Sequence, residues 1–287
     1  YKRQDLTLEH SEHYEITYTW SSDTRFYDVA VGNLNNDTET EIVTVGFGSI
    51  LGIEEYGLIV VGSWNGSFFN RKALTYFPEE IRETKAFGVA LGDVDKDDVT
   101  EIVVVGYTNS TTMGAGFHGQ ITIWNMTGKK LNLETSQEWR SVGDTVWRSV
   151  AISDVDLDGD DEIIVVGDFD DPVRNVRCAE LKICSWDGKI FKWEASRQWY
   201  TYSDTYCQEV VVGNLDSEGI PDIVTIGHQM GSERFYTQLR IWNWKDEILT
   251  LKFSAEGGSA DLFLTNFGTA VAVGDVDNDK INEIVAG

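Results

Sequence analysis

Five acidic loops hold the residues whose types and spacing could do chemistry. Each loop carries oxygen-bearing side chains at places 1, 3, 5 and 9, between two short apolar runs. Alternate residues of a tight turn point inward, so four oxygens converge on one point, and a backbone carbonyl at place 7 can add a fifth. Hard oxygen ligands in this number suit Ca²⁺. Without a cation, the carboxylates would repel one another strongly.

The candidate ligands occupy the same places in every loop. They are Asn33, Asn35, Asp37 and Glu41 in the first loop; Asp93, Asp95, Asp97 and Glu101 in the second; Asp154, Asp156, Asp158 and Glu162, with Asp160 beside them, in the third; Asn214, Asp216, Glu218 and Asp222 in the fourth; and Asp275, Asp277, Asp279 and Glu283 in the fifth. One negative charge for each Asp or Glu at the four places gives −2, −4, −4, −3 and −4. Because ligand charge tunes affinity, we predict up to five structural Ca²⁺ ions, with the first site weakest.

The loops recur at a fixed interval, which is the strongest signal in the sequence. Their first places lie 60, 61, 60 and 61 residues apart. Such regularity over almost the whole chain indicates a repeat architecture. The spacing within a loop is not that of an EF-hand, which needs its last Glu at place 12 and flanking helices. Here the last acid stands at place 9 and opens an apolar run.

Each repeat predicts four strands and no helix. The runs on either side of the acidic loop are continuously apolar, as in 101–105, which is typical of strands buried on both faces. A glycine-bearing loop then leads to a third strand, as at 121–124, and a tight turn leads to a fourth, as at 131–134. The third and fourth strands alternate apolar and polar residues, as expected of half-exposed strands.

This pattern predicts an all-β fold, a β-propeller of four-stranded antiparallel blades. Five repeats of about 60 residues start near residues 27, 87, 148, 208 and 269 of a single domain, 1–287, and the fifth blade is incomplete. Residues 1–26 are expected to supply an outer strand of the closing blade and a linker, because Leu6–Glu9 resembles Leu131–Glu134. Its third strand is absent, so either the chain is cut from a longer one or a neighbouring molecule supplies that strand.

At these residues the chain resembles the FG-GAP or VCBS-type repeats of integrin α-subunit propellers and microbial surface proteins. The shared pattern is an apolar strand, a D-x-D-x-D-G-x-x-D/E loop and a second apolar strand, with Phe87-Gly88 and Phe267-Gly268 echoing the FG pair. The glycine at place 6 is kept only as Gly159 and Gly219, and five repeats fall short of seven blades. The resemblance implies an extracellular calcium-binding propeller whose partner meets the face made by loops 46–57, 106–119, 167–180 and 227–238.

Charge and composition exclude some partners. The 287 residues include 48 Asp and Glu against 23 Lys and Arg, a formal net charge of −25. Such a surface repels phosphates and anionic lipid heads, so we expect no nucleic acid partner. No apolar run approaches the ~20 residues that span a bilayer, so no membrane insertion is expected. The chain opens at Tyr1, which suggests a mature product or a fragment.

Cysteines and sequons leave alternatives open. Cys178 and Cys207 are expected on the same face, where they either form a bridge or join Cys184 as buried free thiols. Four N-x-[ST] sequons, at Asn36, Asn65, Asn109 and Asn125, are either glycosylation sites or turn asparagines.

No catalytic motif stands out. The four histidines (His10, His13, His118 and His228) are scattered, and there is no H-E-x-x-H, G-x-S-x-G or phosphate loop. We therefore expect no enzyme but a calcium-stabilised extracellular or cell-surface propeller, acting in adhesion, surface architecture or binding of a protein or glycan. One alternative is a self-associating subunit of an extracellular filament or surface layer, completed by strand exchange. A carbohydrate-active enzyme, a lyase or glycosidase, is another.

Overall fold

The computed structural model describes residues 23–35, 37–50, 54–78, 83–112, 114–201, 203–216, 218–231, 234–257 and 267–287. Within these ranges it holds 18 strands and no helix. Four sheets have four antiparallel strands each in chain order, and a fifth has two. The predicted all-β class and the four-stranded antiparallel repeat are confirmed.

The sheets follow the repeats. Sheet 1 is β1 (Thr24–Gly32), β2 (Glu41–Ile50), β3 (Glu54–Trp64) and β4 (Phe69–Phe77); sheet 2 is β5 (Thr84–Gly92), β6 (Glu101–Ser110), β7 (Gly116–Thr127) and β8 (Lys130–Trp139); sheet 3 is β9 (Thr145–Ser153), β10 (Glu162–Asp171), β11 (Val176–Trp186) and β12 (Phe191–Trp199); sheet 4 is β13 (Thr205–Gly213), β14 (Asp222–Met230), β15 (Phe235–Lys245) and β16 (Ile248–Gly257); and sheet 5 is β17 (Val271–Gly274) and β18 (Glu283–Ala286).

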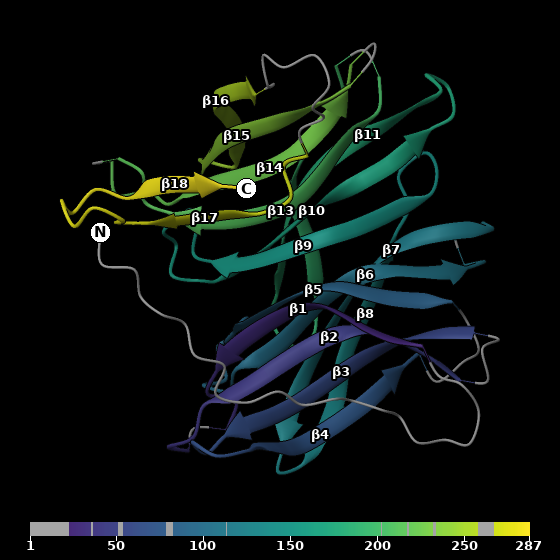
Figure 1. Ribbon diagram of the computed structural model, residues 1–287, viewed down its shortest axis with the longest axis vertical. Coiled ribbons are helices and arrows are strands. Elements are labelled where there is room, and N and C mark those ends of the chain that lie inside the picture. Colours follow the sequence, from purple (N-terminus) through teal and green to yellow (C-terminus); the bar gives the residue numbers. More distant parts are fainter. Residues whose placement is uncertain are drawn as a thin grey trace.

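Successive sheets meet along their first strands. β1, β5, β9, β13 and β17 contact one another in that order, and Figure 1 shows the sheets succeeding one another from β1–β4 to β17–β18. The Val89 amide donates to Asp28 Oδ2 at 2.9 Å, which ties sheet 1 to sheet 2. Glu209 accepts from the Val271 amide in the same way between sheets 4 and 5. Among the described strands, none pairs sheet 5 with sheet 1, so a closed ring is not shown.

The core lies between the sheets. One cluster joins sheets 1 and 2, and others join sheets 2 and 3, 3 and 4, and 4 and 5. The second strands are buried along nearly their whole length, as β6 and β10 show, whereas β8 and β12 are partly exposed. The predictions for the second and fourth strands are confirmed in these sheets. The third strands β7 and β11 were predicted to be half-exposed but are buried along most of their length, since polar side chains such as Lys182 pack against the adjacent sheet, and the first strands β5 and β9 are only partly buried.

A bulge recurs in the first strand of each four-stranded sheet. In sheet 2 the register shifts between Ala86 and Gly88, which leaves Phe87 outside the ladder. The bulged backbone lies against Gly106 of β6, where an added Cβ would stand 1.8 Å from the Lys85 carbonyl oxygen. Only glycine allows such an approach. Glycine stands at the equivalent places of the other three sheets, at Gly46, Gly167 and Gly227.

A second bulge recurs in the fourth strand of these sheets. The pairing of the third and fourth strands skips one residue at the same point each time. The skipped residues are Lys72, Glu134, Glu194 and Lys252. These four residues are called the outer bulge residues below. Two are lysines and two are glutamates, so the charge at this place differs between sheets.

Three further sequence expectations concern the N-terminal segment, the cysteines and the membrane. The expected N-terminal strand at Leu6–Glu9 lies outside the described residues, and of segment 1–26 the described residues 24–26 belong to β1. All three cysteines are buried and free, so the alternative of a Cys178–Cys207 bridge is not realised. A helix able to cross a bilayer is not found in the described part of the chain.

The sequon asparagines that the structure describes form different hydrogen bonds. Asn65 accepts hydrogen bonds from the Ser67 and Phe68 amides, as a turn asparagine does. Asn125 donates to Glu134 Oε1, and Asn36 lies outside the described residues. Glycosylation stays a prediction.

Candidate metal centres

Each acidic loop joins the first strand of a sheet to the second. In four of the five loops, three carboxylates place one oxygen each within 4.8 Å of one another. The groups are Asp37, Glu39 and Glu41; Asp93, Asp95 and Glu101; Asp154, Asp156 and Glu162; and Asp275, Asp277 and Asp279. Glu39, at place 7, was not among the predicted ligands. For the fourth loop, no such group is found among the described residues.

The last ligand of each loop opens the second strand and anchors the loop. Glu41, Glu101 and Glu162 are 0%, 1% and 2% exposed. One oxygen of each accepts a hydrogen bond from the backbone amide at place 2, as Glu101 does from Val94 at 3.0 Å. This bond holds the loop over the carboxylate and leaves the second carboxylate oxygen to face the other acids.

Backbone geometry turns the loop side chains inward. Asp93 accepts hydrogen bonds from the Asp97 and Asp98 amides at 3.1 and 3.0 Å, and Asp97 accepts one from Val99 at 2.8 Å. Place 6 is left-handed whether or not it is glycine, with φ of 90° at Gly159 and 65° at Asp98. The second loop, which has Asp98 in place of glycine, therefore keeps the same left-handed conformation at place 6 as the third loop.

Burial and crowding disturb the carboxylates of loops 2 and 3. Burial, with Asp95 close by, raises the pKa of Glu101 to about 8, and burial with Asp156 close by does the same for Glu162. Asp95 Oδ1 and Asp154 Oδ1 are enclosed and accept no hydrogen bond. Buried oxygens without a donor are costly unless a cation satisfies them. The donor set in these two loops fits a hard divalent cation.

At loops 1 and 4, a lysine ammonium from the fourth strand of the sheet contacts the acids. Lys72 Nζ lies 2.5 Å from Glu41 Oε1 and 2.8 Å from Glu39 Oε2. Lys252 Nζ lies 2.5 Å from Asp216 Oδ2 and 2.8 Å from Asp222 Oδ1. Neither lysine was predicted from the spacing within the loops, although both stand at equivalent places of the fourth-strand segments, as Glu134 and Glu194 do.

The opposite end of the sheets carries a different set of groups. Asp168, fully buried, forms ion pairs with Arg148 and Arg177. The Tyr206 ring lies under Arg177 and stacks on His228 with centroids 4.8 Å apart. Burial lowers the pKa of His228, so its imidazole is neutral at pH 7. Of the other histidines, His118 is buried and hydrogen-bonded to Glu138, and His10 and His13 lie outside the described residues.

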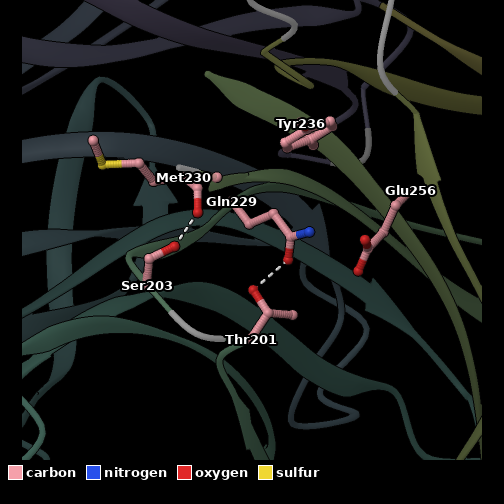
Figure 2. A pocket seen from close by; sticks show the side chains of 7 residues that line it. Thr201, Ser203, Gln229, Met230, Tyr236 and Glu256 are labelled. Carbon is pink, nitrogen blue, oxygen red and sulfur yellow. Dashed lines mark hydrogen bonds between the residues drawn. The ribbon is translucent and has the colours of Figure 1, made fainter. Parts of the chain in front are cut away.

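A hollow of about 450 Å³ opens at that same end of sheet 4. Figure 2 shows Thr201 donating to Gln229 and Ser203 donating to the Met230 carbonyl, with Tyr236 and Glu256 across the hollow. Thr205 pairs with Gln229 at this end, whereas Gly213 pairs with Asp222 beside the acidic loop. The hollow and the acidic loop thus lie at opposite ends of β13 and β14.

No protein-family model matches the chain, and no curated protein is similar enough to count as a relative. Three solved structures are similar to this chain. They are described as rhamnogalacturonan lyase YesW, a Bacillus licheniformis rhamnogalacturonan lyase PL11, and the exotype rhamnogalacturonan lyase YesX, with identities of 13%, 14% and 12% and TM-scores of 0.45, 0.49 and 0.48. Matches cover 91%, 91% and 90% of this chain and 58%, 58% and 55% of theirs. The chain thus spans less than three fifths of their length.

This comparison corrects two expectations. The prediction that the chain is not an enzyme, and the prediction of an adhesion or cell-surface structural module, are contradicted, because the structures found are polysaccharide lyases. The physical reason for the error is that catalytic groups need no local motif when separate strands bring them together. At these identities and TM-scores the likeness assigns no role to any residue of this chain. The FG-GAP resemblance stays an expectation.

Proposed function

We propose that this chain is a calcium-binding β-propeller domain in which the cations are structural. The observation that carries the proposal is the pair of enclosed, donor-free oxygens, Asp95 Oδ1 and Asp154 Oδ1, beside the buried Glu101 and Glu162. A cation at each place would satisfy these oxygens and remove the repulsion among the carboxylates.

The cations would also stabilise contacts between sheets. An added Cβ at Gly188, in the turn between β11 and β12, would stand 2.8 Å from Asp95 Oδ2, so sheet 3 contacts the loop of sheet 2. Lys96 of loop 2 forms an ion pair with Asp160 of loop 3. A metal ion that fixes one loop therefore fixes the surface against which the next sheet packs. Binding to the folded state alone raises stability by mass action.

Thermal unfolding with and without calcium tests this proposal. Saturating calcium should raise the melting temperature by about 5 °C or more over protein in EDTA, as binding far above Kd implies. The Asp95→Asn/Asp154→Asn variant should lose most of that increase, whereas Asp246→Asn, in the exposed turn between β15 and β16, should keep it. An equal melting temperature in calcium and EDTA for the wild-type protein would overturn the proposal.

The same proposal extends to location. Loop sites of this kind, open to solvent at one end of the sheets, suit the higher calcium concentration outside cells, where modest affinity suffices. We therefore place the protein outside the cell or at its surface. Fractionation of native material tests this placement, and recovery only from the cytosol would contradict it.

A second candidate function is cleavage of an acidic polysaccharide, favoured by the arginine cluster at the other end of the sheets. In such an elimination, a base removes the proton beside a uronate carboxylate, the glycosidic oxygen leaves, and a cation neutralises the charge that builds up on the carboxylate. Arg148 and Arg177 offer that positive charge, and the neutral His228 beside them offers a base.

Appearance of unsaturated uronides from acidic polysaccharides tests this second function. The Arg148→Gln/Arg177→Gln variant should lose activity at least 100-fold if both guanidiniums stabilise the developing charge. The exposed Arg197→Gln should keep it. Absence of unsaturated product across a panel of acidic polysaccharides, with the protein folded and calcium-loaded, would exclude this function.

A further inference from the structure

We propose that the outer bulge residue of each four-stranded sheet decides whether the acidic loop of that sheet takes a calcium ion. Glu134 and Glu194 complete the cation sites of sheets 2 and 3, whereas Lys72 and Lys252 stand in place of a cation in sheets 1 and 4. The inference rests on the proposed calcium function and deepens it, because it assigns the metal to some loops and excludes it from others.

The register places these four residues equivalently. In every case the third strand pairs with residues on either side of the bulge, as Ile183 pairs with Ala195 and Cys184 with Trp193 around Glu194. A bulged residue leaves the ladder and is directed by the local bend rather than by the pleat. In sheets 1 and 4 the bulge brings the side chain to the acidic loop, as the lysine contacts show.

Each lysine contacts one oxygen of the buried acid of its own loop, although Asp222 Oδ2 is enclosed without a hydrogen-bond partner. Lys72 bridges Glu39 and Glu41, and the Glu41 side chain is fully buried. Lys252 bridges Asp216 and Asp222, and the Asp222 side chain is 1% exposed. An ammonium with two carboxylate partners at 2.5–2.8 Å supplies the positive charge that the loop requires. A calcium ion in the same place would be repelled by that ammonium.

The two glutamates have the opposite effect on their loops. Asn125 donates to Glu134 Oε1, and Glu134 Oε2 is enclosed with no hydrogen-bond partner. Ser185 donates to Glu194 Oε1 at 2.8 Å from the equivalent place on β11. The third strand thus orients one oxygen of each glutamate. In loop 2, three groups then present enclosed or buried carboxylate oxygens: Asp95, Glu101 and Glu134.

The first place of the loop varies together with the bulge. Loops with a lysine at the bulge begin with Asn33 and Asn214, and loops with a glutamate begin with Asp93 and Asp154. A neutral first ligand accompanies the built-in ammonium, and a charged one accompanies the extra carboxylate. The first place of the loop and the outer bulge residue therefore change charge together, although they lie far apart in the chain. This divides the loops into those with an amide and a lysine and those with two carboxylates.

Calcium stoichiometry under charge exchange at the bulge tests this inference. Glu134→Lys and Glu194→Lys should each lower the bound calcium by about one ion per chain, because each introduces an ammonium into a cation loop. Lys252→Glu with Asn214→Asp, and Lys72→Glu with Asn33→Asp, should each raise it by about one ion. Arg197→Glu, on β12 at an exposed position, changes the charge by as much as each glutamate-to-lysine variant, with the opposite sign, and should leave the count unchanged.

The outcomes separate the inference from the function on which it rests. If the wild-type protein binds no calcium, the proposed function fails. If it binds calcium but Glu134→Lys and Glu194→Lys remove no ion, and the two lysine-to-glutamate variants add none, the inference fails and the function stands. Lysine-to-glutamate variants that do not fold in EDTA are refolded in calcium. If the lysine-to-glutamate variants do not fold even then, the calcium counts of the two glutamate-to-lysine variants, which mimic sheets 1 and 4, test the inference alone.

Discussion

At the scale of single residues, the buried glutamates that open the second strands of sheets 2 and 3 have strongly raised pKa values. Burial and neighbouring acids raise the pKa of Glu101 and Glu162 to about 8. The folded, metal-free protein therefore holds protons there that the unfolded chain, with ordinary glutamates, has released. Folding stability in EDTA should fall as pH rises from about 5 to about 8, since the unfolded state then binds fewer protons.

This pH dependence is a testable prediction. In EDTA, the melting temperature of the wild-type protein should fall relative to that of the Glu101→Gln/Glu162→Gln variant between about pH 5 and pH 8, because glutamine does not titrate. In calcium the trend should reverse for the wild-type protein, since the metal binds the ionised carboxylates. Parallel pH profiles for the two proteins in EDTA would contradict the proposed burial of these charges.

The ligands within each loop could be predicted from the sequence, whereas the lysines that contact loops 1 and 4 could not. Loops 2 and 3 place Asp95, Glu101 and their equivalents together because each ligand set lies within nine consecutive residues. Lys72 and Lys252 reach their loops from 31 and 30 residues further along the chain. Their contacts depend on strand register, which a local spacing pattern does not contain.

At the scale of strands, the paired bulge and glycine fit the first strand of each four-stranded sheet closely against the second. Gly106→Ala should lower the free energy of unfolding by about 3 kcal/mol, because its Cβ would overlap the Lys85 carbonyl and the strand would have to move. Gly257→Ala, whose Cβ would meet nothing within 4 Å, should change it by less than about 0.5 kcal/mol. Urea denaturation measures both, and equal effects would contradict this role of the bulge.

The burial of the second and fourth strands was predictable from the sequence, whereas that of the first and third strands was not. Continuous apolar runs correctly indicated doubly buried second strands such as β6 and β10. The alternating fourth strands were also recognised, yet alternation is broken by one residue at each bulge. That one-residue shift redirects Glu134 and its equivalents toward the loops.

At the scale of the whole molecule, the two ends of the sheets have different chemistry. One end carries the acidic loops, and the other carries the buried Asp168 with its two arginines and the hollow of Figure 2. No local motif unites Arg148, Asp168 and Arg177, because they come from three strands of sheet 3. This explains why the sequence favoured a non-enzymatic function that the comparison with solved structures contradicts.

An anomalous difference map from crystals grown in calcium tests the central claim most directly. We predict peaks among the oxygens of Asp93, Asp95 and Glu101 and among those of Asp154, Asp156 and Glu162, and none where Lys72 and Lys252 meet their acids. Loops 2 and 3 without any peak, in well-ordered crystals with abundant calcium, would contradict the account.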